Sequence, residues 1–166
     1  MYIVTERLEL KAMSEGDIGA LADLLMDDVV KQTYMVPDFP DREGAIAMAQ
    51  RICGLSQEPL KYIAGIYLEG RLIGMLNKTD GDEQKVEVGY ALLPQYYGRG
   101  YATEALTGAI GYFLSQGYQT VLAGAFEHNA ASLRVMAKSG MQLQEYTDFV
   151  EYRGKKHRCI YYAVHA

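Results

Sequence analysis

The sequence contains 166 residues, of which 49% are hydrophobic and 22% are charged, and its formal net charge is −5 at pH 7. This length is typical of one ordinary domain, and the balance of residue types excludes a disordered chain or a fibrous repeat. A nucleic-acid binder needs a basic patch to displace counterions from phosphates, so the acidic balance argues against that class. We therefore expect residues 1–166 to form a single globular domain.

No apolar run approaches the roughly 18 residues of a membrane span. The first residues, MYIVTERLEL, have neither the basic nor the apolar region of a signal peptide. Cys53 and Cys159 are too few for a disulfide framework and are interpreted as reduced thiols packed in the core. These three features predict a cytoplasmic protein without a membrane partner. They leave open whether the protein is a monomer or a homodimer.

The first half of the chain is predicted to run from a strand through two helices. Residues 2–12 alternate as a strand, and Ser14 then starts an apolar pattern with helical spacing. The segment TYMVPDFP contains two prolines and is interpreted as a loop. A second helix is predicted over residues 45–54.

Three strands and a helix are predicted next. The runs KYIAGIYLEG and RLIGMLNKTDG form a hairpin about residues 69–71, and KVEVGYALL follows a turn at Gly81 and Asp82. Residues 101–117 carry apolar and small side chains at helical spacing, with one buried face.

The last third is predicted to add a strand, a helix and two closing strands. The strand TVLAGAF leads to a helix over about residues 130–139, which ends at Gly140. Strands over about 142–152 and 156–164 turn at Arg153 and Gly154. The predicted order is βααβββαβαββ, a mixed α/β arrangement that excludes the strict alternation of a simple Rossmann fold.

The segment LLPQYYGRGYATEAL leads from a strand into a helix, with Gly98 and Gly100 at the junction. Glycine lets backbone amides approach a ligand, and a helix N-terminus offers unpaired N–H groups and a positive dipole end, so together they form an anion cradle. The glycine pair is also compatible with ordinary turn chemistry. A dinucleotide fingerprint would need a glycine where Thr103 stands, and no Gly-Lys-Ser/Thr completes a P-loop.

Gln95, Gly98 and Gly100 complete a Gln/Arg-x-x-Gly-x-Gly/Ala signature, so this stretch resembles the pyrophosphate loop of the GNAT superfamily of N-acetyltransferases. The strand before it, the helix after it and the later Asn129-x-x-Ser132 are similar to that family's order of elements. Together with Glu87 before Gly89-Tyr90, they resemble the branch that acetylates the N-termini of ribosomal proteins. The resemblance is strongest over residues 84–142.

The resemblance implies a mixed, mostly antiparallel sheet of about seven strands with about four helices, and acetyl-CoA as co-substrate. The implied cofactor contacts, many of them through the backbone, are at Leu92, Leu93, Gln95, Tyr96, Tyr97, Gly98, Arg99, Gly100, Tyr101, Ala102, Thr103, Asn129 and Ser132. The three histidines show no convincing metal-ligand spacing, so no metal is predicted.

Acetyl transfer from a thioester to an amine requires a neutral amine, a stabilised oxyanion and an exit route for the thiolate. Glu87 shares its strand face with Gly89 and Ala91, which leave space above the sheet, so Glu87 is the candidate base. An ordinary Glu has a pKa of about 4.3, so this role needs a raised pKa or a relay through water. A solvated strand carboxylate is the alternative.

The resemblance assigns Ser132 to the departing sulfur as acid or hydrogen-bond donor, and Asn129 to the pantetheine arm. Many family members place a tyrosine acid where this chain has Met136, so Ser132 takes that role here. The alternatives are a helix-capping role for Asn129 and an ordinary helix position for Ser132.

The sequence thus predicts an acetyl-CoA-dependent N-acyltransferase that transfers an acetyl group directly to a primary amine, either a protein N-terminus or a small-molecule amine. A non-catalytic acyl-CoA-binding regulatory module on the same fold is the alternative, because binding needs mainly backbone amides. The loop Tyr34–Asp41 is expected to select the acceptor. An acceptor pocket is one interpretation of four tyrosines, and core packing is the other: Tyr34, Tyr62, Tyr67 and Tyr146.

Overall fold

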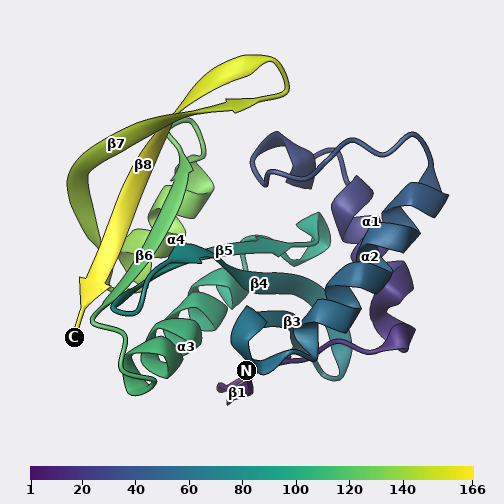
Figure 1. Cartoon of the computed structure of the whole chain (residues 1–166), viewed down its shortest axis with the longest axis horizontal. Helices are drawn as coiled ribbons and strands as arrows, with labels where there is room; N and C mark the ends of the chain where they lie inside the picture. The colour runs from purple at the N-terminus through teal and green to yellow at the C-terminus, as the bar shows by residue number, and fades with distance from the viewer.

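The computed structural model describes residues 1–166 and contains one sheet of eight strands in the order β1-β2-β3-β4-β5-β6-β8-β7 (Figure 1). Its strands are β1 Ile3–Val4, β2 Leu8–Lys11, β3 Ile63–Leu68, β4 Arg71–Gly81, β5 Lys85–Leu92, β6 Thr120–Phe126, β7 Gln142–Tyr152 and β8 Lys155–His165. All neighbouring strands are antiparallel except β5 and β6, which are parallel. This confirms the predicted mixed, mostly antiparallel α/β fold.

Four α-helices accompany the sheet: α1 Ile18–Met26, α2 Arg42–Ser56, α3 Tyr101–Ser115 and α4 Ala130–Lys138. Four short 3₁₀ turns lie between the elements: η1 Glu15–Asp17, η2 Val30–Gln32, η3 Pro59–Lys61 and η4 Pro94–Tyr96. None of the helices is long and apolar enough to cross a membrane. The predicted helices therefore all exist, although α2 is longer at both ends and α1 begins after the 3₁₀ turn that Ser14 caps.

The prediction of one strand over residues 2–12 was wrong, and the sheet therefore has eight strands rather than about seven. A turn at residues 5–7 splits this stretch, so that β1 folds back antiparallel on β2. The Thr5 amide donates to the Leu8 carbonyl at 2.9 Å, and the Leu8 amide donates to the Thr5 hydroxyl at 3.1 Å. Residues 5–7 are Thr, Glu and Arg, so the apolar alternation is interrupted at the turn.

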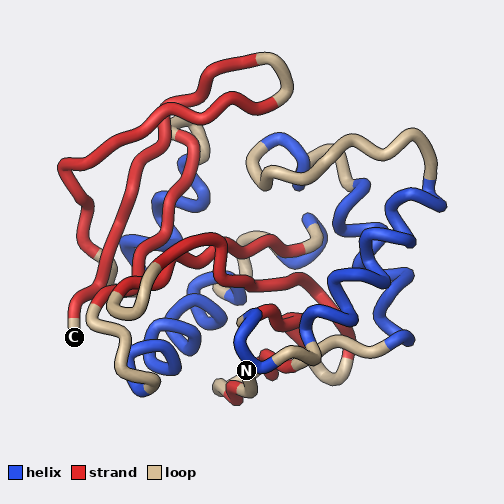
Figure 2. Tube along the Cα trace, in the orientation of Figure 1, coloured by secondary structure: helices blue, strands red, loops and turns tan.

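The helices cover both faces of the sheet, two on each face (Figures 1 and 2). Along β5, Val86 and Val88 pack into a buried cluster with the apolar side of α3, whereas Ala91 belongs to a second cluster with α1 and α2. The alternation of side chains along a strand separates these two sets. The predicted buried face of α3 is confirmed by Ala105, Leu106, Ala109, Ile110 and Phe113.

The sheet forks between β5 and β6. The two strands pair only over Lys85–Glu87 with Thr120–Leu122. Beyond Glu87, β5 pairs only with β4, as far as Leu92. Beyond Leu122, β6 pairs only with β8, as far as Phe126. Figure 2 shows β6, β7 and β8 turning away from β5. The backbone of residues 88–92 therefore has a partner strand on one side only.

The far end of the β7–β8 hairpin returns to the body of the protein. The Tyr152 hydroxyl lies 2.9 Å from the Lys31 carbonyl, its closest acceptor, and 3.3 Å from the Val36 carbonyl. Arg153, in the hairpin turn, pairs with Asp38. We call these contacts the hairpin clasp. It joins residues more than a hundred positions apart.

Glu104 in the first turn of α3 holds the β1–β2 turn in place. Its carboxylate accepts from the Thr5 hydroxyl at 2.6 Å and from the Arg7 amide at 2.7 Å, and it pairs with the Arg7 guanidinium at 2.6 Å. The Glu104 side chain is only 14% exposed. Because Arg7 itself is 43% exposed, these contacts are only partly shielded from solvent.

We predict that Glu104→Gln lowers the free energy of unfolding by about 2 kcal/mol at pH 7, because hydrogen bonds to a charged group are lost. Burial opposes ionisation of Glu104, and the Thr5 and Arg7 hydrogen bonds outweigh it, so the pKa of this carboxyl is lowered. A lowered folded-state pKa adds stability above the unfolded pKa, and this stability is lost as the pH falls through the folded value.

Urea unfolding from pH 7 to pH 3 measures this effect, and the difference from wild type should shrink below about pH 4. Glu127→Gln is the control, because Glu127 forms an exposed pair with Arg158 and should change stability by less than about 1 kcal/mol. Equal effects of the two substitutions would contradict the prediction.

Candidate active site

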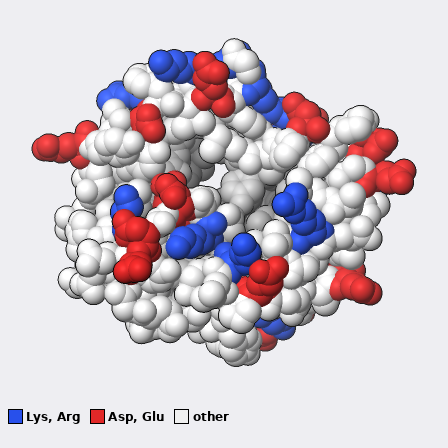
Figure 3. All heavy atoms as spheres, viewed as in Figure 1, with Lys and Arg blue, Asp and Glu red and all other residues white.

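A cavity of about 540 Å³ lies at the fork, between β5, the start of α3, α4 and the η2 segment. Ten of the thirteen predicted cofactor residues line it: Leu92, Tyr96, Tyr97, Gly98, Gly100, Tyr101, Ala102, Thr103, Asn129 and Ser132. Figure 3, drawn in the orientation of Figure 1, shows a hollow near the centre of the molecule, beneath the β7–β8 hairpin. The fold therefore brings together two segments that lie about 30 residues apart in the sequence.

The predicted turn has the geometry of an anion cradle. Gly98 and Gly100 have φ values of 73° and 83°, a conformation that residues with a Cβ rarely adopt. The first intrahelical bond of α3 runs from the Glu104 amide to the Gly100 carbonyl at 3.0 Å, and the amides of residues 98–103 have no backbone partner. All of these residues except Arg99 line the cavity at the positive end of the α3 dipole, so the residues present fit a pyrophosphate.

Two cations on α4 add to the positive potential of this cavity. Arg134 and Lys138 line it and lie four residues apart, on one side of the helix. Neither residue was predicted from the sequence to contact the cofactor. Their helical spacing was a signal that could have been used, because the helix itself was predicted.

Arg7 also supports the cradle, and no spacing in the sequence could have revealed it. Its guanidinium donates to the Arg99 carbonyl at 3.1 Å and lies 4.7 Å from the centre of the Tyr101 ring. Because the same guanidinium pairs with Glu104, Arg7 links the glycine turn to the first turn of α3. The predicted cofactor residue Arg99 does not line the cavity, and its carbonyl is occupied by this bond.

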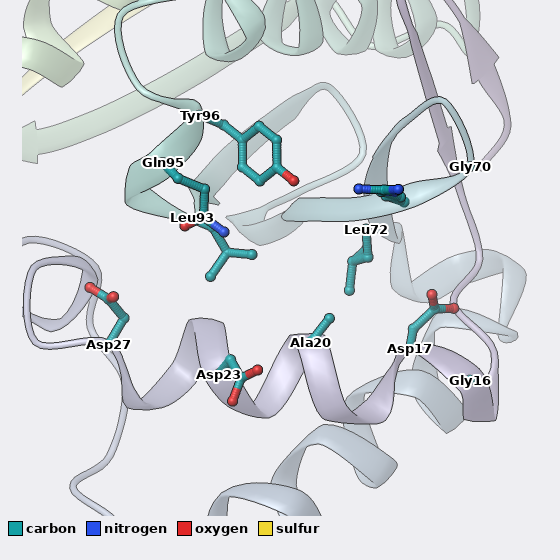
Figure 4. Close-up of a pocket in the computed structure, with 11 residues that line it drawn as sticks. Gly16, Asp17, Ala20, Asp23, Asp27, Gly70, Leu72, Leu93, Gln95 and Tyr96 are labelled. Atoms are coloured by element: carbon teal, nitrogen blue, oxygen red, sulfur yellow. The ribbon is translucent and has the colours of Figure 1, made fainter.

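Leu93 and Gln95 face a different cavity, of about 580 Å³, beside α1 (Figure 4). The Leu93 amide is already bonded to the Ile73 carbonyl at 2.8 Å. Asp23 and Asp27 line this second cavity, and their negative charge disfavours an anionic ligand. The second cavity is therefore not an extension of the anion cradle.

Asn129 and Ser132 lie together at the start of α4. The Asn129 side chain accepts from the Ser132 amide at 3.1 Å, so Asn129 caps the helix and also lines the cavity. The Ser132 hydroxyl lies 2.8 Å from the hydroxyl of Tyr90 on β5. Met136 is fully buried, so α4 offers no other catalytic side chain at that turn. Sequence reasoning did not identify Tyr90 as a partner of Ser132.

Glu87 lies at the point where the fork begins. It is the last residue of β5 that pairs with β6, and it shares a strand face with Gly89, which lines the cavity. Burial raises the pKa of the Glu87 carboxyl, and the Thr79 hydroxyl opposes this effect. Glu87 is half-buried and does not itself line the cavity.

Two tyrosines of the β7–β8 hairpin lie near Glu87. The Tyr161 ring lies against Gly124, where an added Cβ would come within 2.6 Å of the ring. The centre of the Tyr161 ring lies 5.2 Å from the centre of the Tyr146 ring. Burial raises the pKa of Tyr161, and the negative charge of the Glu87 carboxylate raises it further. Tyr34 lines the cavity and donates to the Asn77 side chain at 2.6 Å.

The four tyrosines named from the sequence divide into two pairs. Tyr34 and Tyr146 lie near the fork as described, whereas Tyr62 and Tyr67 pack elsewhere. Tyr62 contacts the Phe113 ring at 5.3 Å, and Tyr67 is buried and donates to Asp17 at 2.8 Å. Packing is therefore the better interpretation for the second pair.

Cys53 and Cys159 are free and buried, as predicted. His157 stacks on Phe126 at 4.4 Å between ring centres, and the ring of His128 lies 5.6 Å from Phe126. No group of three or more His, Cys, Asp or Glu side chains is placed to hold a metal ion.

Comparison with known proteins identifies the family. Residues 7–142 match the acetyltransferase (GNAT) domain. The chain is 29% identical over 143 residues to the uncharacterized N-acetyltransferase YoaA of Bacillus subtilis, an alignment that covers 83% of this chain and 81% of the relative.

Solved structures share the fold. A GNAT-family acetyltransferase from Bacillus anthracis superposes with a TM-score of 0.85 and 23% identity, over 99% of this chain and 98% of that one. The ribosomal L7/L12 alpha-N-protein acetyltransferase RimL in complex with coenzyme A superposes with a TM-score of 0.81 and 21% identity, over 99% and 98% of the two chains. Because the family match spans most of its length, this chain belongs to the GNAT acetyltransferases and is an acetyl-CoA-dependent acyltransferase.

Proposed function

We propose that residues 1–166 form a single acyl-CoA N-acyltransferase domain that transfers an acetyl group from acetyl-CoA directly to a primary amine. The observation that carries this proposal is the fork between β5 and β6, since its cavity connects the anion cradle with the strand face of Glu87. Direct transfer between two bound substrates needs proximity and orientation rather than an enzyme nucleophile. The free buried cysteines take no part in it.

On the donor side, the amides of residues 98–103 bind the pyrophosphate, with Arg134 and Lys138 nearby. The one-sided backbone of residues 88–92 pairs with the amide groups of the pantetheine arm in the manner of an added strand. When bound, acetyl-CoA supplies an activated acetyl group. Ser132, which lines the cavity at the start of α4, donates a hydrogen bond to the departing sulfur.

On the acceptor side, Glu87 takes the proton of the attacking amine, either directly or through water. Its raised pKa brings it nearer the working range of a general base, although an α-amine, with a pKa of about 7.7 to 8.0, needs less help than a lysine. The loop Tyr34–Asp41 selects the acceptor, because Tyr34 lines the cavity and Asp38 holds the hairpin clasp.

The acceptor is a protein N-terminus or a small-molecule amine. RimL, which shares the fold, is described as a ribosomal L7/L12 alpha-N-protein acetyltransferase, and this likeness supports a peptide α-amine as the first acceptor to test. No observation favours the non-catalytic binding module. Acetyl-CoA consumption across a panel of peptides and small amines tests the proposal, and tight CoA binding without turnover on any amine would overturn it.

We predict that Gly98→Ala raises the Kd for CoA about tenfold. Alanine in this left-handed conformation costs about 1 to 2 kcal/mol, and CoA binding must hold the turn in that conformation. Gly117→Ala is a matched control, because Gly117 has a φ of 95° but lies outside the cavity, and an added Cβ meets no atom within 4 Å at either site. Calorimetry should show weaker binding for Gly98→Ala alone, and equal losses would contradict the assignment.

We predict that Glu87→Gln lowers kcat about a hundredfold, because an amide cannot accept the amine proton. A base with a raised pKa works only above that pKa, so the wild-type rate should fall at low pH after correction for the ionisation of the acceptor. The variant should lack this fall. Glu83→Gln, in the exposed turn before β5, should keep the wild-type profile. An unchanged profile in Glu87→Gln rules out the base assignment.

We predict that the double variant Tyr152→Phe/Arg153→Gln raises KM for the acceptor about fivefold and leaves KM for acetyl-CoA unchanged. The clasp contacts that it removes contribute a free energy of roughly 1 kcal/mol. Arg158→Gln removes a comparable exposed ion pair from the same hairpin and is the control. Steady-state kinetics with each substrate varied separates the two constants. A parallel rise in both would place the clasp outside acceptor selection.

A further inference from the structure

Tyr90 lies on β5 one residue after Gly89, with its side chain on the opposite face of the strand. It packs against the cluster that contains Val86 and Val88 and lines the cavity. Its hydroxyl reaches across the fork to α4, where it lies 2.8 Å from the Ser132 hydroxyl and 3.4 Å from the Ser132 carbonyl. One pair of hydroxyls thus joins β5 to α4 across the cavity.

Ser132 carries the only side-chain hydroxyl that α4 contributes to the cavity. A serine in a helix commonly turns its hydrogen back toward a carbonyl of the preceding turn, where it cannot serve a ligand. Here the Ser132 hydroxyl has no bond to a backbone carbonyl, and its one partner is Tyr90. Either hydroxyl can be the donor in this bond, so the direction of the Ser132 hydrogen depends on which of the two donates.

Tyr90 keeps its proton throughout the neutral range, because burial raises its pKa to about 12. A protonated phenol can donate to the serine oxygen, and the serine hydrogen is then free to point into the cavity. Donation by one hydroxyl also polarises the next, so the second donor becomes stronger. Met136 is fully buried, and no other hydroxyl of α4 could replace this arrangement.

We propose that Tyr90 is a positioning residue that donates to the Ser132 oxygen and thereby directs the Ser132 hydrogen to the departing sulfur of coenzyme A. The inference rests on the proposed function, in which Ser132 contacts that sulfur. The amine nitrogen forms a bond to the acetyl carbonyl carbon, the carbon–sulfur bond breaks and its electron pair goes to sulfur, while the Ser132 hydrogen bond stabilises the developing thiolate. The amine proton passes to Glu87 and then to solvent, and the thiolate takes up a proton from solvent, so the net products are an amide and a thiol.

A double-mutant cycle of Tyr90→Phe and Ser132→Ala tests this inference, with kcat and both KM values measured for each variant on an accepted amine. Each single variant should lower kcat about tenfold and leave both KM values within about twofold. The double variant should be no slower than either single variant, because Tyr90 acts only through Ser132. Tyr112→Phe, on the far part of α3, is the control and should keep wild-type kcat.

Three other outcomes are informative. A normal kcat in Tyr90→Phe together with a slow Ser132→Ala overturns the inference but leaves the proposed function intact. A slow Tyr90→Phe with a normal Ser132→Ala, or independent losses that multiply in the double variant, shows that Tyr90 acts by itself and also overturns it. If wild type binds CoA but acetylates no amine, the proposed function itself fails. Thermal unfolding of each variant identifies any loss that comes from instability.

Discussion

β5 and β6 pair in parallel over three residues, and the site depends on how soon that pairing ends. After Glu87, β5 remains bonded to β4, while β6 follows β8 in another direction. Backbone groups seek partners when they are buried, so a strand with one open side is a natural place for a ligand that can hydrogen-bond like a strand. The same separation places the starts of α3 and α4 on either side of one cavity.

The glycine turn is held in shape by residues from the opposite end of the sequence. Arg7 bonds the Arg99 carbonyl and pairs with Glu104, while Thr5 and the Arg7 amide occupy the other oxygen of the same carboxylate. The amides of the cradle are thus fixed before a ligand arrives, which reduces the entropy lost on binding. Family membership establishes acetyl-CoA as the donor, and this clamp gives a physical reason why so short a turn can bind it.

The β7–β8 side of the fork is built differently, from a long hairpin rather than a packed core. β7 is mostly exposed and forms an edge of the sheet, so little burial fixes its far end. The clasp of Tyr152 and Arg153 with residues 31–38 supplies the missing restraint. A few surface contacts therefore determine the position of this hairpin.

The sequence by itself determined the order and type of most elements and the position of the glycine turn before α3. Those features depend on local chemistry: the apolar periodicity of α3, the conformational freedom of Gly98 and Gly100, and the helix start that Asn129 caps. Tertiary structure alone decided the clamp by Arg7, the Tyr90–Ser132 pair and the hairpin clasp. Each of these joins residues that are distant in sequence through side-chain hydrogen bonds, and neither periodicity nor spacing carries information about such contacts.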